Sequence, residues 1–339
     1  MCSSMLIKSM QGGYFWGRTM DFAASMFHDQ EAGGHIPSQI ISIPAKIIVP
    51  AQSGEWESRY ATVGVGTAGN TILYDGINEC GLTGDLQVLM ECSYADADSL
   101  QSRGLKGILG EEVVTNVLTT CKDVSDVREF AKTHGLINKK YDDGGDGTSI
   151  PVHYAFIDET GAGVVLEPTD HGAFKVYDYI GEMTNSPEYG YHTTNLRNYI
   201  SLDNLNRSHA TQVGDTEIKP IEAGTGYGMF GLPGDFTSPS RFVRAMFVKN
   251  NIDAFNDDEG ITTLYNCFKT VMIPKGLSRT PEATAVTDYT QYWTGYDLSK
   301  RTMYLQDSTC LTMTVKQIDS SLSKITFQDI NLTPVVHEI

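Results

Sequence analysis

The sequence predicts an α+β protein. Three observations support this class: strand-like segments fill the first ninety residues, two helical patterns follow each other in the middle, and strands return towards the C-terminal end. Strands and helices come in separate runs, with little of the strict alternation that parallel βαβ units require. We therefore expect layered sheets with helices on their outer faces.

Five segments near the N-terminal end are typical of strands, namely 5–8, 14–22, 39–49, 61–65 and 71–89. Isoleucines alternate with other residues in the third segment, and Asp75 and Gly76 are expected to form a turn within the last. A sheet is therefore predicted to begin close to residue 5.

Two helices are predicted between residues 105 and 134. Over 105–120 apolar residues recur every three to four positions, which indicates an amphipathic helix. A second helix is expected over 127–134, with Ser125 as its N-cap and Gly135 as the left-handed residue that ends it.

The rest of the sequence predicts strands, then short helices, then strands again. Segments 153–157 and 163–167 indicate a hairpin around the polar turn 158–161, and another strand is expected over 173–179. Helices are expected over 192–202, 240–248 and 260–271, and strands over 292–306 and 311–317.

The composition is that of an acidic globular protein with enough apolar residues for a sizeable core: 339 residues, 40% hydrophobic, formal net charge −17. This charge argues against nucleic acid and anionic membranes as partners, because both attract clustered Lys and Arg, so a small molecule or a protein is favoured. No stretch approaches the ~20 apolar residues of a membrane span, and Lys8 and Gln11 interrupt the run that a signal peptide needs. A cytoplasmic protein is therefore expected.

Neither a cofactor nor a metal ion is indicated. The six cysteines form no CxxC pair, and the eight histidines fall at no ligand spacing. The glycines of 224–228 lack the full dinucleotide-binding pattern, and no GxSxG nucleophile elbow is present.

Cys2 is the most informative residue. Once Met1 is removed, Cys2 carries both a thiol and a free α-amino group, so one residue can supply nucleophile and base. In model peptides the thiol titrates near pH ~8.5 and the amine near ~7.7–8.0, so a neutral amine can accept the thiol proton without a histidine partner.

Arg18 and Asp21 add charged groups to a segment that otherwise reads as a buried strand. A functional interpretation is that Asp21 orients the α-amino group of Cys2 while Arg18 favours the thiolate. Because the two residues lie three positions apart, a bend or bulge is required if both are to point into one site. The alternative is a structural ion pair.

Five blocks of sequence occur in a characteristic order: Cys2-Ser3-Ser4; Gly17-Arg18-Thr19-Met20-Asp21-Phe22; Tyr74-Asp75-Gly76-Ile77-Asn78-Glu79 with Gly81-Leu82; Met183-Thr184-Asn185-Ser186-Pro187; and Gly231-Leu232-Pro233-Gly234-Asp235 with Ser240-Arg241-Phe242. With these blocks the chain resembles the choloylglycine hydrolase family, which holds the bile salt hydrolases and penicillin V acylases. The similarity covers nearly the whole chain.

The resemblance implies a single N-terminal nucleophile hydrolase domain over residues 1–339, folded as a four-layer αββα sandwich that cleaves a linear amide bond. Cys2 matches the family nucleophile, and Arg18 and Asp21 match the residues that position and activate it. Asn185 matches the side-chain amide of the oxyanion hole, although a turn residue before Pro187 would suit the local sequence equally well. Arg241 matches a second arginine near the nucleophile, with an exposed helical arginine as the alternative. Family members often form tetramers, so a homo-oligomer is expected.

Within the family, the sequence leads us to expect a penicillin V acylase, which releases 6-aminopenicillanic acid and phenoxyacetate. The blocks at 187–197 and 234–237 favour this branch. Val88 stands where the two classes carry Tyr or Asn; a valine retains the backbone N–H of the oxyanion hole but not that polar or aromatic side chain. Met20, Phe22 and Val88 are candidates for an apolar acyl pocket, whereas Asp85 and Gln87 are expected to point away from it.

Three other functions remain open. The chain can be a conjugated bile salt hydrolase, or an acylase of another N-acyl small molecule such as an acyl-homoserine lactone. From a different class, a non-catalytic binding protein on the same fold would be expected to lose Cys2 or Asn185, and neither is lost.

Overall fold

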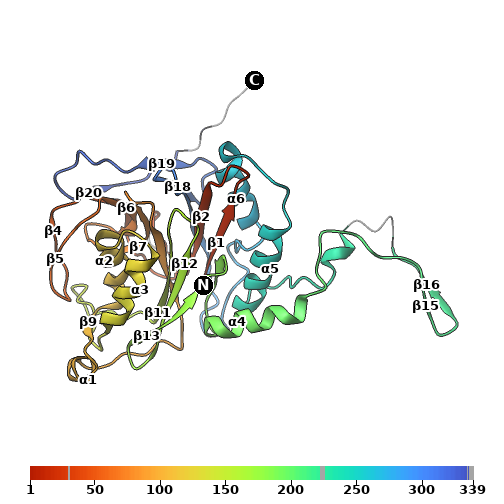
Figure 1. Cartoon of the computed structure of the whole chain (residues 1–339), viewed down its shortest axis with the longest axis horizontal. Helices are drawn as coiled ribbons and strands as arrows, with labels where there is room; N and C mark the ends of the chain where they lie inside the picture. Colours follow the sequence, from red (N-terminus) through yellow and green to blue (C-terminus); the bar gives the residue numbers. More distant parts are fainter. Residues whose placement is uncertain (30, 222–225, 334, 336–339) are drawn as a thin grey trace.

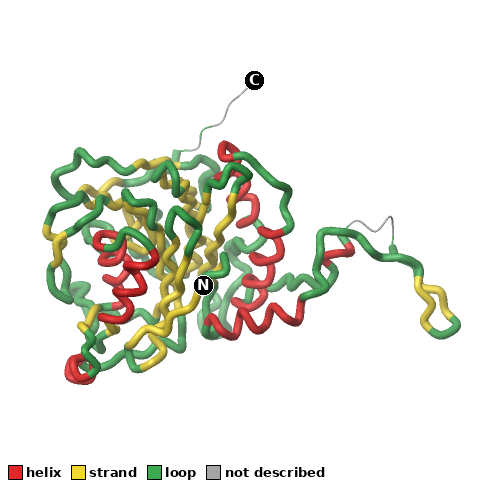
Figure 2. The backbone as a smooth tube through the Cα atoms, viewed as in Figure 1, coloured by secondary structure: helices red, strands yellow, loops and turns green. Residues whose placement is uncertain are grey.

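The structure is a computed structural model that describes residues 1–29, 31–221, 226–333 and 335. Two large β-sheets face each other and helices cover both outer faces, which gives the expected four-layer αββα sandwich (Figure 1). Helices α2 and α3 pack on one sheet, and α5 and α6 pack on the other. Figure 2 shows the strands gathered in the middle of the molecule, with helices to either side.

The smaller sheet has six strands in the order β14-β1-β2-β17-β18-β19. All of its pairs are antiparallel, and it carries the N-terminal end of the chain in β1. In sheet order the bounds are β14 (Glu182–Met183), β1 (Cys2–Lys8), β2 (Tyr14–Phe22), β17 (Tyr289–Asp297), β18 (Thr302–Asp307) and β19 (Thr314–Gln317).

The larger sheet has ten strands, and only its β10–β9 pair is parallel among the strand pairs described. In sheet order the bounds are β20 (Thr326–Gln328), β3 (Ser38–Ile43), β6 (Thr62–Thr67), β7 (Leu73–Asn78), β8 (Thr83–Val88), β11 (Val152–Ile157), β12 (Gly163–Asp170), β13 (Ala173–Asp178), β10 (His134–Leu136) and β9 (Lys106–Ile108). Small two-stranded sheets are formed by β4 (Ile48–Val49) with β5 (Trp56–Glu57), and by β15 (Thr211–Val213) with β16 (Thr216–Ile218).

Six α-helices lie within the described residues: α1 (Ala97–Ser102), α2 (Val113–Thr120), α3 (Val124–Thr133), α4 (Tyr189–Asn195), α5 (Ser238–Asn250) and α6 (Gly260–Phe268). Short 3₁₀ turns are η1 (Gly110–Glu112), η2 (Leu196–Tyr199), η3 (Tyr227–Met229) and η4 (Asp257–Glu259). None of the described helices is long and apolar enough to cross a membrane.

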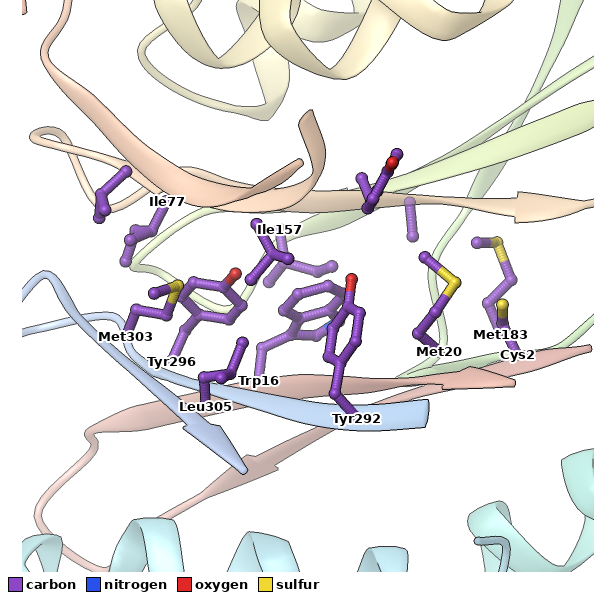
Figure 3. Packing of buried hydrophobic residues seen from close by; sticks show 14 of the residues in the cluster. Cys2, Trp16, Met20, Ile77, Ile157, Met183, Tyr292, Tyr296, Met303 and Leu305 are labelled. Carbon is purple, nitrogen blue, oxygen red and sulfur yellow. The ribbon is translucent and has the colours of Figure 1, made fainter. Parts of the chain in front are cut away.

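Buried side chains fill the space between the two sheets. Trp16, Tyr292 and Tyr296 lie at the centre of this layer, and Cys2 and Met20 lie towards one end of it (Figure 3). Two further clusters pack the helices against the outer faces of the sheets. The nucleophile candidate therefore belongs to the inner layer of the sandwich.

Several predicted boundaries were wrong. The helix expected over 105–120 begins only at Val113, because β9 and η1 occupy its first residues. Asp123 rather than Ser125 caps α3, since its side chain accepts from the backbone N–H of Asp126. Gly135 is an extended residue of β10 and not a left-handed helix end. Of the glycines in 224–228, which lack the dinucleotide-binding pattern, Gly224 lies outside the described residues.

The turn predicted at Asp75 and Gly76 is also absent from its expected place. Both residues lie inside β7, and the chain instead reverses between Asn78 and Thr83, where Gly81 has a φ of 84°. Partners from the opposite sheet, described below, hold Asp75 in an extended strand.

Candidate active site

Cys2 is the first residue of β1 and pairs with Met20 of β2. Its side chain is a buried free thiol, and the Arg18 Nη2 atom lies 2.9 Å from Sγ. In this structure Met1 still precedes Cys2, and the Met1 nitrogen and carbonyl bond to the backbone of Asp21 at 2.6 and 2.9 Å. Removal of Met1 would place a free α-amino group beside the same sulfur.

Arg18 is fully buried and faces several anionic or polar groups. Its guanidinium lies 3.3 Å from Asp75 and 3.6 Å from Asp85, and Nη2 also donates to the Leu86 carbonyl at 3.2 Å. Burial by itself would lower the pKa of Arg18, but Cys2 and the neighbouring acidic groups raise it well above its ordinary value. A fixed positive charge therefore lies against the Cys2 sulfur.

Asp75, on β7 of the larger sheet, is held by side chains of the smaller sheet. Besides Arg18, it accepts a hydrogen bond from the Tyr292 hydroxyl at 2.8 Å and a short one from the Tyr296 hydroxyl. These bonds satisfy the hydrogen-bonding capacity of a carboxylate that has no solvent exposure. They also hold Asp75 in place as a fixed partner for the Arg18 guanidinium.

Asp21 approaches Cys2 from the other face of β2, so the expected bend that turns both side chains to one face is not present. The Asp21 carboxylate accepts from Thr19 at 3.2 Å and from Thr290 at 2.6 Å, and lies 3.9 Å from Arg241. The register irregularity lies in the neighbouring strand β17, between Thr290 and Tyr292. Arg18 thus contacts the sulfur side of Cys2, whereas Asp21 borders its backbone side.

Asn185 lies next to Cys2, two residues after the end of β14. Its Oδ1 atom accepts from the Cys2 nitrogen at 2.7 Å and from Arg241 Nη2 at 2.8 Å. These two donors fix the orientation of the amide, so Nδ2 points to the Val88 carbonyl, which it meets at 3.0 Å. An amide nitrogen carries two hydrogens, and the second is available to a bound substrate.

The Val88 backbone faces the same region. The Leu89 N–H bonds to the Pro151 carbonyl, so the neighbouring pair Val88–Val152 is a non-hydrogen-bonded pair of the antiparallel ladder. The N–H and C=O of Val88 therefore both point away from β11, towards Asn185. Strand β7 pairs with β8 only as far as Asp85, which leaves this side of Val88 open.

Arg241 is completely buried and not the exposed helical arginine that was the alternative. It lies in the first turn of α5, where it contacts the Cys2 carbonyl, donates to Ser3 Oγ at 2.6 Å and reaches Asn185. At this helix start the Asp235 carboxylate accepts hydrogen bonds from the Thr237 hydroxyl at 2.6 Å, from Ser240 Oγ at 2.7 Å and from Thr237 N at 2.9 Å, and these bonds lower the pKa of Asp235 to about 2.

Two buried histidines hold the Asn185 segment through hydrogen bonds, a structural role in keeping with the absence of any metal-ligand spacing among the histidines. His153 Nε2 lies 2.8 Å from the Thr184 carbonyl and its Nδ1 lies 3.0 Å from Glu167. His192 Nε2 lies 2.8 Å from the Asn185 carbonyl. Burial lowers the pKa of His192 to about 4, so this ring is neutral near pH 7 and donates through Nε2.

A cavity of about 400 Å³ opens onto Cys2. Met20, Phe22 and Val88 line it, as do several apolar residues that the sequence did not single out: Met26, Ile36, Ile72, Tyr74, Leu86 and Ile150. Polar groups in the lining include Asn70, Glu111 and Tyr141. Gln87 also contributes to the wall, contrary to the expectation that it points away, because residues 86–88 border the gap beside β7.

Among the residues that the structure describes, no group of three or more His, Cys, Asp or Glu side chains is arranged to hold a metal ion. The chemistry available here is that of a buried thiol, two guanidinium groups and an amide.

The family model for linear amide C–N hydrolases of the choloylglycine hydrolase family matches residues 2–329. The chain belongs to this family. It is therefore a hydrolase of linear amide bonds, and the site around Cys2 lies in the part of the chain that the family model covers.

Curated relatives of the chain include bile salt hydrolases. The bile salt hydrolase/transferase of Clostridium perfringens is 29% identical over 311 residues, which cover 90% of this chain and 88% of the relative. The conjugated bile acid hydrolase of Lactobacillus gasseri is 26% identical over 308 residues, with 90% and 92% covered.

Solved structures share the fold. The R18L variant of conjugated bile acid hydrolase from C. perfringens aligns over the full length of both chains, with a TM-score of 0.85 and 24% identity. Penicillin V acylase from Agrobacterium tumefaciens aligns with a TM-score of 0.73 and 19% identity, over 98% of this chain and 92% of the other. At these identities the likeness concerns the fold alone.

Proposed function

We propose that the protein is a cysteine N-terminal nucleophile amidohydrolase in which Cys2 attacks the carbonyl carbon of an N-acyl substrate. The observation that carries this proposal is that Arg18, Asn185 and Arg241 all contact Cys2, Arg18 at its sulfur and the other two at its backbone. Arg18 lies at the sulfur, and Asn185 lies at the nitrogen that becomes the α-amino group.

The reaction follows from these positions. After Met1 is removed, the α-amino group accepts the thiol proton, and Sγ forms a bond to the substrate carbonyl carbon. The carbonyl oxygen becomes an oxyanion, to which Asn185 Nδ2 and the Val88 N–H donate. Two such donors lower the barrier, each by up to about 2.7–4 kcal/mol in comparable sites.

The tetrahedral intermediate then breaks its C–N bond. The amine leaves with the proton that the α-ammonium group returns, and a thioester to Cys2 remains. Water attacks this thioester while the α-amino group accepts a proton from it, and cleavage of the C–S bond releases the carboxylic acid and restores the thiol.

We further propose that conjugated bile salts are the preferred substrates, in place of the penicillin V expected from the sequence. A cavity of about 400 Å³ with a mainly apolar wall is of the size that encloses a drug-sized ligand. A single phenoxyacetyl ring would leave much of it unfilled, whereas a steroid acid with several fused rings would bury more apolar area. The polar side chains Asn70, Glu111 and Tyr141 offer partners for steroid hydroxyl groups. The similarity of the chain to bile salt hydrolases supports the same choice.

The test is amine release from glycocholate, taurocholate and penicillin V at equal concentrations, with Cys2→Ala as the control. We expect release from the bile salts, slower release from penicillin V and none with Cys2→Ala. A clear preference for penicillin V would contradict the substrate assignment. Undiminished release by Cys2→Ala would contradict the nucleophile assignment.

We also propose that the protein forms a homo-oligomer through the arm that carries β15 and β16. Figure 1 shows this hairpin extended away from the two sheets. Val213, Ile218 and Ile221 on the arm are more than half exposed, at 59%, 54% and 77%, which is unfavourable unless another surface covers them. A second copy of the chain is the partner we expect.

Light scattering after size-exclusion chromatography tests this proposal. The wild type is expected to run as an oligomer, and Val213→Asp with Ile218→Asp is expected to reduce its mass, because charge in an apolar interface is costly. Lys219→Gln, on the same arm, is the control and should leave the mass unchanged. A monomeric wild type would contradict the proposal.

A further inference from the structure

Asp85 is a buried carboxylate beside Arg18 that the reaction described above does not use. It lies on β8 with no solvent exposure, 3.6 Å from the Arg18 Nε atom. Gln87 Nε2 donates to its Oδ2 at 2.8 Å, while Oδ1 has no hydrogen-bond partner among the described residues. A carboxylate so poorly satisfied is costly to keep ionised.

Arg18 is shared by two carboxylates and the Cys2 sulfur. Asp75 lies on one side of the guanidinium, Asp85 on another, and the Cys2 sulfur 2.9 Å from Nη2. Asp75 is stabilised by two tyrosine hydroxyls, but Asp85 has only Gln87 in addition to Arg18. Asp85 is thus the carboxylate whose charge is less well supported.

The surroundings of Asp85 raise its pKa above the ordinary value for an aspartate. Burial raises its pKa to about 6, even though Arg18 and Gln87 oppose the shift. Asp75 on β7 raises the pKa of Asp85 further. His153 on β11, which pairs with Gln87 of β8, lowers it. Cys2 faces it from β1 across the guanidinium. Both charge states of Asp85 are therefore populated around pH 6.

We propose that Asp85 is a positioning residue that sets how strongly Arg18 stabilises the Cys2 thiolate. When Asp85 is ionised, it competes with the Cys2 sulfur for the Arg18 guanidinium, and it adds a second negative charge, besides that of Asp75, near the sulfur. When Asp85 is protonated, it no longer competes, and the Arg18 guanidinium interacts with Asp75 and the thiolate alone. The proposal rests on the proposed role of Cys2 as nucleophile, and it means that the site is arranged to keep its nucleophile reactive in mildly acidic conditions.

Alkylation of Cys2 tests this without an amide substrate. Wild type and Asp85→Asn are treated with iodoacetamide between pH 5 and pH 7.5, and labelling of the N-terminal peptide is followed by mass spectrometry. At pH 5 the two rates should be nearly equal, because Asp85 is then mostly protonated and Asn mimics that state. At pH 7.5 the variant should react on the order of tenfold faster, since one unit of thiol pKa corresponds to a factor of ten in the thiolate.

Glu182→Gln is the matched control. Glu182 is also fully buried, and burial raises its pKa to about 7, but its ion pair is with Lys249 at 3.2 Å. Its rate ratio to wild type should stay near one at every pH. Asp85→Glu should restore a pH-dependent ratio, which a merely structural role for Asp85 would not explain.

A ratio for Asp85→Asn that is constant with pH, or below one at pH 7.5, would overturn the proposal. If Asp85→Asn fails to fold, the wild-type profile decides: we expect a second inflection near pH 6, and a single thiol titration would overturn the idea. Amide hydrolysis is measured in parallel. If no substrate were hydrolysed, the proposed function would be contradicted. The alkylation rates would still test the proposed role of Asp85 independently.

Discussion

Asn185 provides the sharpest test of the oxyanion assignment, because its two amide atoms have separable tasks. Oδ1 accepts from Cys2 and Arg241, whereas Nδ2 donates to Val88 and has one hydrogen left for the substrate. Asn185→Asp preserves the shape and the Oδ1 acceptor but replaces the donor with a second oxygen. Asn185→Ala removes both.

The expected magnitudes follow from these contacts. Loss of one oxyanion donor lowers kcat by about 10²–10³-fold, or about 2.7–4 kcal/mol, with little change in KM because the bond forms fully only in the transition state. Asn185→Asp should lose at least as much activity, since its negative charge lies where the oxyanion develops. Asn185→Ala should also lose about 1–3 kcal/mol of stability, because Arg241 Nη2 and the Cys2 nitrogen lose the acceptor that they share.

The assay combines steady-state kinetics on the preferred bile salt with urea unfolding and with Cys2 alkylation. Alkylation reports that the nucleophile is intact, and it should stay within a few-fold of wild type for Asn185→Ala. The reasoning fails if either variant keeps kcat within tenfold of wild type while Cys2 alkylates normally. It also fails if the loss appears in KM alone.

Three further predictions concern the groups around Asn185. Because the pKa of His192 is lowered to about 4, the native state binds fewer protons than the unfolded state between pH 6.5 and pH 4. The free energy of unfolding should therefore be highest above pH 6.5 and fall by on the order of 3 kcal/mol as the pH drops towards 4. In His192→Gln the free energy of unfolding, measured by denaturation at several pH values, should depend less on pH over this range. Asp235→Ala should lower stability by about 1 kcal/mol above pH 4 and reduce kcat through Arg241, and the difference should vanish as pH falls towards 2; denaturation at several pH values checks the sign. Val88→Pro removes the free backbone N–H and should lower kcat by at least ~10²-fold, whereas Val88→Ala keeps it and should stay within about tenfold, as kinetics on one substrate would show.

The parts of the fold that local sequence encodes were predictable. The strand expected over 14–22 corresponds to β2, residue for residue, and the hairpin around 158–161 lies where its polar turn predicts. Asp75 was misread because Asp-Gly is a turn signal in isolation, while three partners from distant strands hold it extended. Long-range hydrogen bonds of this kind leave no trace in a local pattern.

The candidate site was predictable to the extent that single residues resemble a family motif. Cys2, Arg18, Asn185 and Arg241 are brought together as the resemblance implies, but the side of β2 from which Asp21 acts depends on strand geometry. The partners of His153 and His192 could not be predicted from the sequence, because the contacts with the Thr184 and Asn185 carbonyls join residues 31 and 7 positions apart and use the backbone of the partner residue. No residue preference at the partner position records such a bond.

The early end of the β7–β8 ladder at Asp85 has a consequence for how the site can change in evolution. On the side that faces β7, peptide groups 86–88 make no cross-strand hydrogen bonds. The sheet loses the folding free energy of these bonds, but main-chain donors stay free for a ligand. Lengthening β7 by one or two paired residues would strengthen the sheet and close the site, while substitutions in the surrounding loops would alter the ligand without touching the ladder. Selection for stability and selection for catalysis thus act in opposite directions on the same short stretch of backbone.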